Sequence, residues 1–469
     1  MLTFDVHEQV KNSRYKKMFS KILVANRGEI AVRIIRACRE MGISTVAIYS
    51  EADKDAMHVQ LADESYCVGG NRVADSYLNI PAILTVAVES GAQAIHPGYG
   101  LLSENAKFVS LCEQCNINFI GPTSDMIAML GDKDAARKTM RAAGVPVTPG
   151  CDIVETLDEA KEKAEKIGFP LLIKARSGGG GKGIRRVNYI ENFEEAFLSA
   201  SAEAKAAFGD GACYLEKFIF PVKHIEMQLL CDKYNNIICL GERECSVQRK
   251  NQKMIEESPS PALDEKTRKQ MMIAAVKAAK AVNYVNAGTV EFLLDKQNNF
   301  YFMEMNTRLQ VEHGVTEMVT GLDIVQWQIR IAAGARLTRT QDSIFTHGNV
   351  IECRINAENP DKNFRPSCGR IKRLHTPGGS FVRFDTAIYQ DYVVPPYYDS
   401  MIGKLIVQAR SRAEAIRKMK MALSELTIDG IDINRDILAE ILSDDRFVSG
   451  EYTTDFMENF EKTRALRKD

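Results

Sequence analysis

The stretch NAGTVEFLLDKQNNFYFMEMNTRLQVEH, residues 286–313, decides the fold that we expect for this chain. The segments GTVEFLLD and FYFMEMN are rich in apolar and aromatic residues, and the polar residues between them are typical of a turn. We therefore predict two antiparallel strands joined by a four-residue loop, 296–299, so that Asp295 pairs with Phe300. A polar strip follows the second strand.

This register places Glu291 opposite Glu304, and strand alternation puts Asn306 on the same face. Neighbouring strands lie about 4.8 Å apart, so the two carboxylates would repel each other unless a cation lay between them. Two carboxylates and an amide oxygen are hard ligands that suit Mg²⁺, which proteins usually share with substrate phosphates. The alternative is an exposed, solvated pair at the edge of a hairpin. The polar groups that follow favour the metal site: Arg308, Gln310, Glu312 and His313.

Length, charge and cysteine content bound the class of protein. A chain of 469 residues is long enough for two to four domains. The formal net charge of −1 gives no support for binding to nucleic acid or to a membrane surface, and no unbroken apolar run has transmembrane length. Many of the 11 cysteines lie in apolar patterns, which favours free thiols in a reducing compartment, the cytoplasm. The polar first 17 residues are either a genuine extension or precede a start at Met18.

Residues 21–121 alternate between strand-like and helix-like segments. KILVAN, TVAIYS, SYCVG, AQAIHPG and INFIGP are typical of strands, and EIAVRIIRACREMG and SENAKFVSLCEQCN are typical of amphipathic helices. This alternation predicts βαβ units and a parallel sheet. The first strand leads into NRGEIA, but Gly28 stands alone and GxGxxG is absent, so an NAD-dependent oxidoreductase is disfavoured.

Four consecutive glycines, residues 178–181, stand between two strand-like segments in FPLLIKARSGGGGKGIRRV. Glycines leave the backbone free to fold over phosphates, and Lys174 and Lys182 add positive charge. The run is not a Walker A loop, because Gly183 rather than Ser or Thr follows Lys182. We predict a mobile lid over a nucleotide, with a flexible linker as the alternative.

Taken together, the motifs ANRGEIA, IHPGYGLLSEN, GDK, LLIKA, SGGGGKG, EMNTRLQVEH, ECRINAE and PPYYDSMIGKL resemble biotin carboxylase, the ATP-grasp component of biotin-dependent carboxylases. The similarity runs from about residue 20 to about residue 455. It implies an α/β fold in several parts. These are an N-terminal extension (1–19), a Rossmann-like domain (20–130), an ATP-grasp domain (131–345) with a mobile glycine-rich lid (about 150–218), a C-terminal α+β domain (346–456) and a tail (457–469).

The resemblance also implies an activity. ATP would phosphorylate bicarbonate to carboxyphosphate, and the carboxyl group would then pass to N1′ of biotin. The implied cofactors are ATP, Mg²⁺ (or Mn²⁺) and biotin, which is a substrate carried by a partner. The implied partners are a biotin carboxyl carrier protein, carboxyltransferase subunits and a second copy in a homodimer, without nucleic acid or membrane. Acetyl-CoA carboxylase of fatty acid biosynthesis is the favoured complex, and the ATP-binding subunit of pyruvate carboxylase is the alternative.

Roles at matching positions follow from the same resemblance. The implied ATP-binding residues are Lys133, Lys174, Gly180, Gly181, Glu216, Lys217, Phe218, Ile219, His224, Asn251, Glu291, Leu293 and Glu304. The implied metal ligands are Glu291, Glu304 and Asn306, and bicarbonate or biotin would contact Lys253, Arg308, Gln310, the backbone of Val311, and Arg354. The implied catalytic residues are Lys253, Arg308, Glu312 and Arg354. Glu312 would be the base that deprotonates bicarbonate. Arg354 would stabilise the biotin enolate because arginine stays charged, although its strand pattern alone favours a surface arginine.

Two positions depart from the family pattern. Asn251 replaces the histidine of HQK, so it can still donate a hydrogen bond to ribose but cannot become cationic. Gly314 replaces the proline after His313, which we expect to loosen the backbone beyond Glu312 without loss of chemistry. The triplet MKM around Lys420 imitates a biotinylation site, but its helical pattern argues against modification.

Two other functions stay open at this point. One is a different ATP-grasp ligase that activates bicarbonate or a carboxylate for an amine acceptor, and the other is a nucleotide-binding scaffold without chemistry. ECRINAE and TRLQVEH argue against the first. The chemically competent residues at every proposed catalytic position argue against the second.

Overall fold

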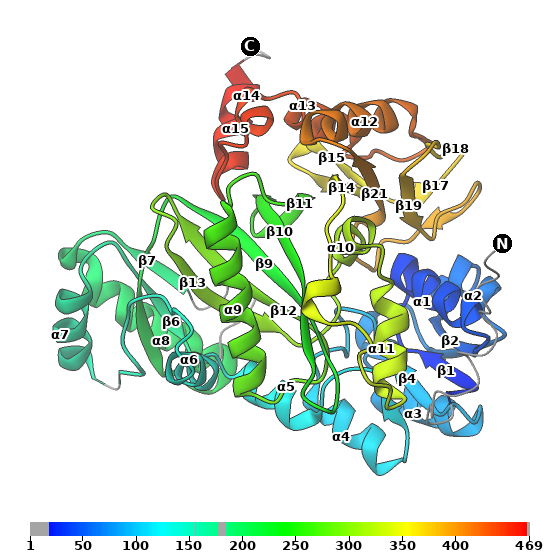
Figure 1. The fold of residues 1–469 in the computed structure, drawn as a ribbon, viewed down its shortest axis with the longest axis horizontal. Coiled ribbons are helices and arrows are strands. Elements are labelled where there is room, and N and C mark those ends of the chain that lie inside the picture. The colour runs from blue at the N-terminus through cyan, green and yellow to red at the C-terminus, as the bar shows by residue number, and fades with distance from the viewer. Residues whose placement is uncertain (1–17, 155, 177–183, 467–469) are drawn as a thin grey trace, which may run out of the picture.

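The structure is a computed structural model that describes residues 18–154, 156–176 and 184–466 (Figure 1). The first 17 residues and the glycine run with Gly180 and Gly181 lie outside the described residues. No helix in the described ranges is long and apolar enough to cross a membrane. None of the 11 cysteines, all of which lie in these ranges, forms a disulfide.

A parallel five-stranded sheet forms the N-terminal part, in the order β3-β2-β1-β4-β5. This sheet confirms the predicted alternation of strands and helices, because apolar residues such as Ile22 on β1 and Ile34 on α1 share one buried cluster. The strands are β1 (Lys21–Val24), β2 (Ser44–Ser50), β3 (Glu64–Gly69), β4 (Ala94–His96) and β5 (Asn118–Phe119), and the helices are α1 (Gly28–Glu40), α2 (Met57–Leu61), α3 (Ile80–Glu89) and α4 (Ala106–Gln114).

A second sheet runs through the middle of the molecule. Among the described residues it has eight strands, in the order β13-β12-β9-β10-β11-β14-β21-β19. Helix α9 (Glu265–Ala281) packs against β9 and β10, and α10 (His313–Thr320) and α11 (Ile324–Ala332) follow the hairpin (Figure 1). The strands are β9 (Val222–Cys231), β10 (Ile237–Arg249), β11 (Gln252–Ser258), β12 (Asn286–Asp295), β13 (Phe300–Asn306), β14 (Asn349–Asn356), β19 (Val382–Thr386) and β21 (Met401–Ala409). One sheet therefore joins segments on both sides of residue 345.

A smaller antiparallel sheet, β7-β6-β8, lies in the segment that we expected to form the lid. Its strands are β6 (Leu171–Ala175), β7 (Ile184–Val187) and β8 (Cys213–Lys217), and α7 (Leu157–Ile167) and α8 (Phe193–Phe208) belong to the same unit. Apolar residues such as Ile173 and Phe193 give this unit its own buried cluster. The predicted strands on both sides of the glycine run are thus confirmed. Helices α5 (Ser124–Gly131) and α6 (Lys133–Ala142) precede the unit.

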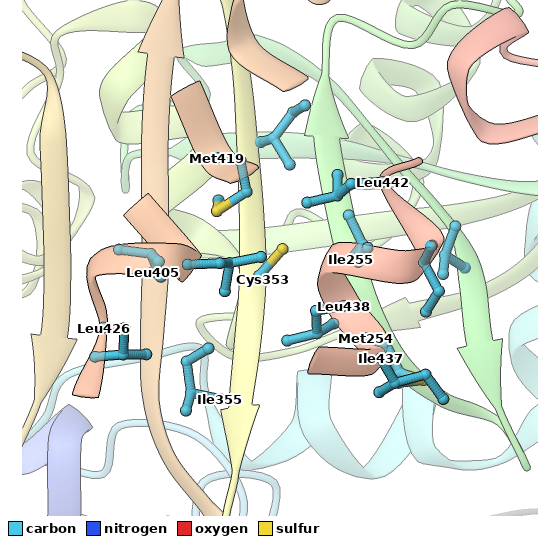
Figure 2. Close-up of a cluster of buried hydrophobic side chains, with 14 of the residues drawn as sticks. Met254, Ile255, Cys353, Ile355, Leu405, Met419, Leu426, Ile437, Leu438 and Leu442 are labelled. Atoms are coloured by element: carbon cyan, nitrogen blue, oxygen red, sulfur yellow. The ribbon is translucent and has the colours of Figure 1, made fainter. Parts of the chain in front are cut away.

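Figure 2 shows buried apolar side chains that the C-terminal strands and helices contribute to one cluster. Cys353 of β14 and Leu405 of β21 lie in a buried apolar cluster with Met419. Because successive strand residues point to opposite faces, Arg354 and Lys404, which are paired in register, lie on the other face. The helices are α12 (Arg412–Glu425), α13 (Arg435–Ile441), α14 (Asp445–Ser449) and α15 (Phe456–Leu466), and the short strands are β15 (Glu358–Asn359), β16 (Arg365–Pro366), β17 (Gly369–Arg370), β18 (Arg373–His375), β20 (Val393–Val394) and β22 (Thr427–Asp429).

Candidate active site

The acidic hairpin forms as predicted at its carboxylates and differs at its loop. Glu291 pairs with Glu304 across β12 and β13, which confirms the predicted opposition. The predicted pair of Asp295 with Phe300 is wrong, because Leu294 takes that place and a register shift follows Glu291. The Asp295 carboxylate accepts hydrogen bonds from two backbone N–H groups of the loop, both at 2.9 Å, and so belongs to the turn.

Of the two opposed carboxylates, Glu291 contacts a cation, Lys253, whereas Glu304 has no cation in contact with it among the described residues. Glu304 forms no hydrogen bond or ion pair with any residue that the structure describes. Burial and the neighbouring Glu291 raise the pKa of Glu304, and Nδ2 of Asn306 is buried without a partner. Lys133, Glu304 and Asn306 line one cavity of about 220 Å³. These groups fit a divalent cation that is shared with phosphate oxygens.

Lys253 of β11 lies at the centre of the site. Its Nζ contacts Glu226 at 2.7 Å, Glu291 at 3.0 Å and Glu312 at 2.7 Å. Burial would lower the pKa of Lys253, but these carboxylates hold it well above its usual value. Ligand atoms of His224, Glu226 and Glu291 are also close enough to share a cation. Lys253 already supplies positive charge to two of these three residues, so we assign no metal there.

Glu312 lies between cations at the start of α10. One of its oxygens accepts a hydrogen bond from Arg354 Nη2 at 2.8 Å, and Arg354 Nε donates to Glu256 at 2.7 Å. Burial alone would raise the pKa of Glu312, but Lys253, Arg354 and Arg243 hold it well below its usual range. The Arg354 side chain is only 15% exposed. It therefore belongs to the site and is not the surface arginine that its strand pattern favours.

The strip after the hairpin ties the remaining predicted bicarbonate residues together. Arg308 donates to Glu104 and to the Gln310 side-chain oxygen, both at 2.8 Å. Gln310 Nε2 in turn donates to Glu291 at 3.1 Å, and the Val311 carbonyl accepts a hydrogen bond from Lys404 at 2.6 Å. Arg308 and Gln310 are therefore connected through Glu291 to Lys253 and Glu312, whereas the second predicted metal carboxylate, Glu304, stays outside this network.

Several predicted nucleotide residues lie on or directly after strands β6 and β8 of the smaller sheet. Lys174 of β6 forms an ion pair with Glu216 of β8. The backbone N–H groups of Lys217 and Phe218 donate to carbonyl groups at 2.7 and 3.1 Å, so these two donors are already used within the chain. Ile219 follows them directly.

The other predicted nucleotide residues lie at two places, on the paired strands β9 and β12 and on the turn between β10 and β11. His224 and Leu293 are register neighbours on β9 and β12, and His224 Nε2 lies 3.0 Å from Glu291. Asn251 is exposed on the turn between β10 and β11, with a φ of 66°. Among the described residues, no hydrogen bond joins its side chain to the rest of the site. The structure thus brings His224, Leu293 and Glu291 together and leaves Asn251 at a hairpin tip.

Sequence reasoning missed several charged residues of this network, namely Glu104, Glu226, Arg243, Glu256 and Lys404. A usable signal exists in β9, where His224, Glu226 and Gln228 alternate with apolar residues and therefore share one face. A charged residue inside an apolar strand, such as Lys404 in MIGKLIVQA, is a similar signal, since lysine is almost never fully buried unless it is paired.

Three family models match most of the chain. Residues 18–127 match the model described as biotin carboxylase, N-terminal domain. Residues 132–340 match carbamoyl-phosphate synthase L chain, ATP binding domain, and residues 352–459 match biotin carboxylase C-terminal domain.

Curated relatives and solved structures agree with these matches. The chain is 55% identical to biotin carboxylase of Nostoc sp. over 445 residues, which is 95% of this chain and 100% of the relative. It is 51% identical to the 2-oxoglutarate carboxylase small subunit of Hydrogenobacter thermophilus, covering 94% and 93% of the two chains. A biotin carboxylase–β-γ-ATP complex from Campylobacter jejuni matches with a TM-score of 0.91 and 50% identity, covering 94% of this chain and 99% of that one. The biotin carboxylase subunit of a pyruvate carboxylase matches with a TM-score of 0.83 and 51% identity, covering 95% and 99%.

Proposed function

The chain belongs to the biotin carboxylase family and has the biotin carboxylase activity of a biotin-dependent carboxylase, and we propose that it carboxylates biotin on a separate carrier protein through carboxyphosphate. The position of Glu312 carries this proposal. Its ionised carboxylate lies between Lys253 and Arg354, and Lys253 also contacts Glu291 of the opposed acidic pair.

In the first step, an oxygen of bicarbonate attacks the γ-phosphorus of ATP, ADP leaves, and carboxyphosphate forms. Glu312 accepts the proton of bicarbonate, which makes the attacking oxygen more nucleophilic. Lys253, Arg308, Gln310 and the N–H of Val311 would orient bicarbonate. To do so, these side chains would exchange part of their contacts with glutamates for contacts with the substrate.

The nucleotide would lie against the acidic hairpin. Glu291, Glu304 and Asn306 would hold Mg²⁺, or Mn²⁺ in its place. When bound, such an ion neutralises the charge that develops on the phosphate oxygens. Lys133 shares a cavity with Glu304 and would contact the same phosphates, as would Lys174. The lid glycines Gly180 and Gly181, the segment Glu216 to Ile219, and the residues His224, Asn251 and Leu293 would complete the site.

In the second step, the carboxyl group passes to N1′ of biotin. The bond to phosphate breaks, the departing phosphate takes the proton of N1′, and the resulting biotin enolate forms the new N–C bond. Arg354 would stabilise the biotin enolate, because its guanidinium is planar and stays charged. Since Arg354 lies 2.8 Å from Glu312, both steps would take place at one point in the site.

A direct assay tests this proposal. We expect purified protein with ATP, Mg²⁺ and bicarbonate to release phosphate faster when free biotin is added. Folded protein that shows no stimulation by biotin would reject the proposal. Tight ATP binding without turnover would indicate a scaffold instead, and labelled bicarbonate in a product other than carboxybiotin would indicate a different ligase.

For the complete enzyme we infer acetyl-CoA carboxylase, with pyruvate carboxylase as the second candidate. The two relatives at 55% identity carry the name biotin carboxylase alone, whereas subunits of pyruvate and 2-oxoglutarate carboxylases match at 51%. Purification of the native partners, followed by carboxylation assays with acetyl-CoA, pyruvate and 2-oxoglutarate, distinguishes these complexes. Incorporation of label into pyruvate or 2-oxoglutarate alone would overturn acetyl-CoA carboxylase.

We also infer a homodimer in a reducing compartment such as the cytoplasm. A biotin carboxylase domain from Hydrogenobacter thermophilus is a dimer in its crystal, and the cysteines of this chain are free thiols. Light scattering should give about twice the chain mass of 52.4 kDa. A mass equal to that of one chain at assay concentration would contradict the dimer.

A further inference from the structure

A fully buried lysine lies next to the proposed base without being part of the proposed chemistry. Lys404 of β21 is paired in register with Arg354 of β14, so the two side chains share the face of the sheet that carries the site. Lys404 has no exposed surface. Its Nζ donates to the Val311 carbonyl at 2.6 Å and lies 3.3 Å from a Glu29 carboxylate oxygen.

The Val311 carbonyl is a sensitive place for such a contact. It belongs to the planar peptide unit whose N–H is that of Glu312, so a bond to this oxygen fixes the orientation of the peptide. The preceding peptide is held in a similar way, because His313 Nδ1 lies 2.8 Å from the Gln310 carbonyl. Since a carbonyl oxygen only accepts hydrogen bonds, Nδ1 carries the proton and donates. Two buried side chains therefore orient the two consecutive peptides on either side of the Val311 residue.

The other end of the Lys404 contact lies in the N-terminal part of the chain. Glu29 is the second residue of α1, and the Tyr99 hydroxyl donates to the same oxygen that faces Lys404. Glu29 and Lys404 are both almost completely buried. Lys404 thus connects three parts of the molecule at one atom: the N-terminal sheet through Glu29, the strip through Val311, and the C-terminal strands through its own backbone.

We propose that Lys404 is a positioning residue that holds the peptide between Val311 and Glu312, so that the Glu312 carboxylate faces bicarbonate beside the Val311 N–H, which belongs to the peptide held by His313. The proposal rests on the proposed function, because it assigns bicarbonate to this strip. Lys404 itself does not contact substrate. Its ammonium group acts only through the backbone of the residue before the base.

This role has a specific kinetic signature. When a reacting group is displaced by about 1 Å, the rate can fall by about 10²-fold. Loss of the Lys404 donor frees the peptide at the bicarbonate subsite and leaves the acidic hairpin and the cavity around Lys133 unchanged. We therefore expect the KM for bicarbonate to rise by at least about tenfold, with the dissociation constant for MgATP within about twofold of wild type.

The variants must separate positioning from folding. Lys404→Met removes the donor but leaves Glu29 as an unpaired buried carboxylate, which is strongly destabilising. The double variant Glu29→Gln/Lys404→Met removes both charges and keeps an acceptor for Tyr99. Lys404→Arg keeps a cationic donor in a different shape. Lys420→Met is the matched control, because Lys420 is exposed on α12 of the same C-terminal part.

The assay is bicarbonate-dependent carboxylation of free biotin, combined with equilibrium binding of MgATP. We expect the raised KM for bicarbonate in both Met variants, partial recovery in Lys404→Arg, and wild-type values in Lys420→Met. A folded double variant with the wild-type KM for bicarbonate would overturn the proposal. So would a parallel loss of MgATP affinity, or a double variant that does not fold, because either result indicates a purely structural lysine. An inactive wild-type protein would instead reject the proposed function, and this inference with it.

Discussion

At the residue scale, Glu312 shows how a buried carboxylate is kept ionised. Burial opposes the charge, but Lys253, Arg354 and Arg243 outweigh it and hold the pKa of Glu312 well below its usual range. A base must be unprotonated to accept a proton, so these cations extend the working range of Glu312 to lower pH. The same cations would weaken Glu312 as a base, and the proposed exchange of Lys253 contacts from glutamate to substrate would relieve this conflict.

The Lys253→Met variant tests this balance. Removal of a cation 2.7 Å from Glu312 destabilises its anion, so the pKa of Glu312 rises. We expect the acid limb of the residual kcat/KM profile to move to higher pH by about 1–3 units. The acid limb of Lys253→Arg should stay closer to that of wild type, because arginine keeps the positive charge. An unchanged acid limb in Lys253→Met would show that Glu312 is not the titrating base.

Gly314 has a packing role that its sequence pattern does not reveal. A Cβ at this position would lie 2.4 Å from Ile406 Cδ1 and 3.3 Å from a Glu352 oxygen. We expect Gly314→Ala to lower the free energy of unfolding by about 1–3 kcal/mol through overpacking. Ile406→Val removes the clashing methyl group and should recover part of that loss. Urea denaturation of the four proteins in this double-mutant cycle measures the coupling. If the two substitutions changed the free energy of unfolding in a strictly additive way, the assigned overpacking between position 314 and Ile406 would be contradicted.

At the element scale, the turn between β10 and β11 explains why asparagine suits position 251. Arg249 pairs with Gln252, so Lys250 and Asn251 form a two-residue turn, and both have positive φ, 48° and 66°. Hairpins with two-residue loops favour this geometry, and asparagine tolerates it better than most residues. The backbone geometry therefore accommodates asparagine at this position.

Substitution at this turn gives an element-scale prediction. Asn251→Val should destabilise the protein by about 1–3 kcal/mol, because a β-branched residue is strained at positive φ. Asn251→Gly should be close to neutral, since glycine adopts positive φ freely. Thermal unfolding of both variants checks this difference. Equal unfolding temperatures for the valine and glycine variants would contradict the assigned turn.

Element patterns also show what could be predicted from sequence. The apolar runs of β12 and β13 identified the hairpin, and counting along it correctly placed Glu291 opposite Glu304. The count failed at Asp295, because a register shift between Glu291 and Phe292 passes over Met303 and leaves Asp295 in the turn. The contacts of Lys253 with Glu226 and of Arg354 with Glu256 join strands that are distant in sequence. Such contacts depend on tertiary register, which no local pattern specifies.

At the scale of the whole molecule, buried neutral histidines make folding sensitive to acid. Burial lowers the pKa of His58 to about 4 and those of His96 and His313 to about 3. In the unfolded chain each would titrate near pH 6.5. Between these values the unfolded state binds more protons than the folded state, so stability falls as the pH drops below about 6.5.

His58 lets this effect be measured away from the site, because its Nε2 lies 3.2 Å from the Ile48 carbonyl and its Nδ1 has no hydrogen-bond partner among the described residues. It should contribute up to about 1.4 kcal/mol per pH unit between about pH 6.5 and pH 4. We expect His58→Gln to lower the unfolding temperature at pH 7.5 and to flatten its dependence on pH in that window. Curves for the variant and wild type that run parallel across the window would contradict the buried neutral state.

The central claim is that the opposed carboxylates hold the metal and nucleotide for carboxylation of biotin. The most direct test is incorporation of labelled bicarbonate into free biotin by Glu304→Gln, at saturating ATP and Mg²⁺. Loss of one carboxylate ligand should lower the rate by about 100-fold or more, which corresponds to about 2.7 kcal/mol. The exposed control Glu265→Gln should retain the wild-type rate. Carboxylation by Glu304→Gln at the wild-type rate would contradict the account.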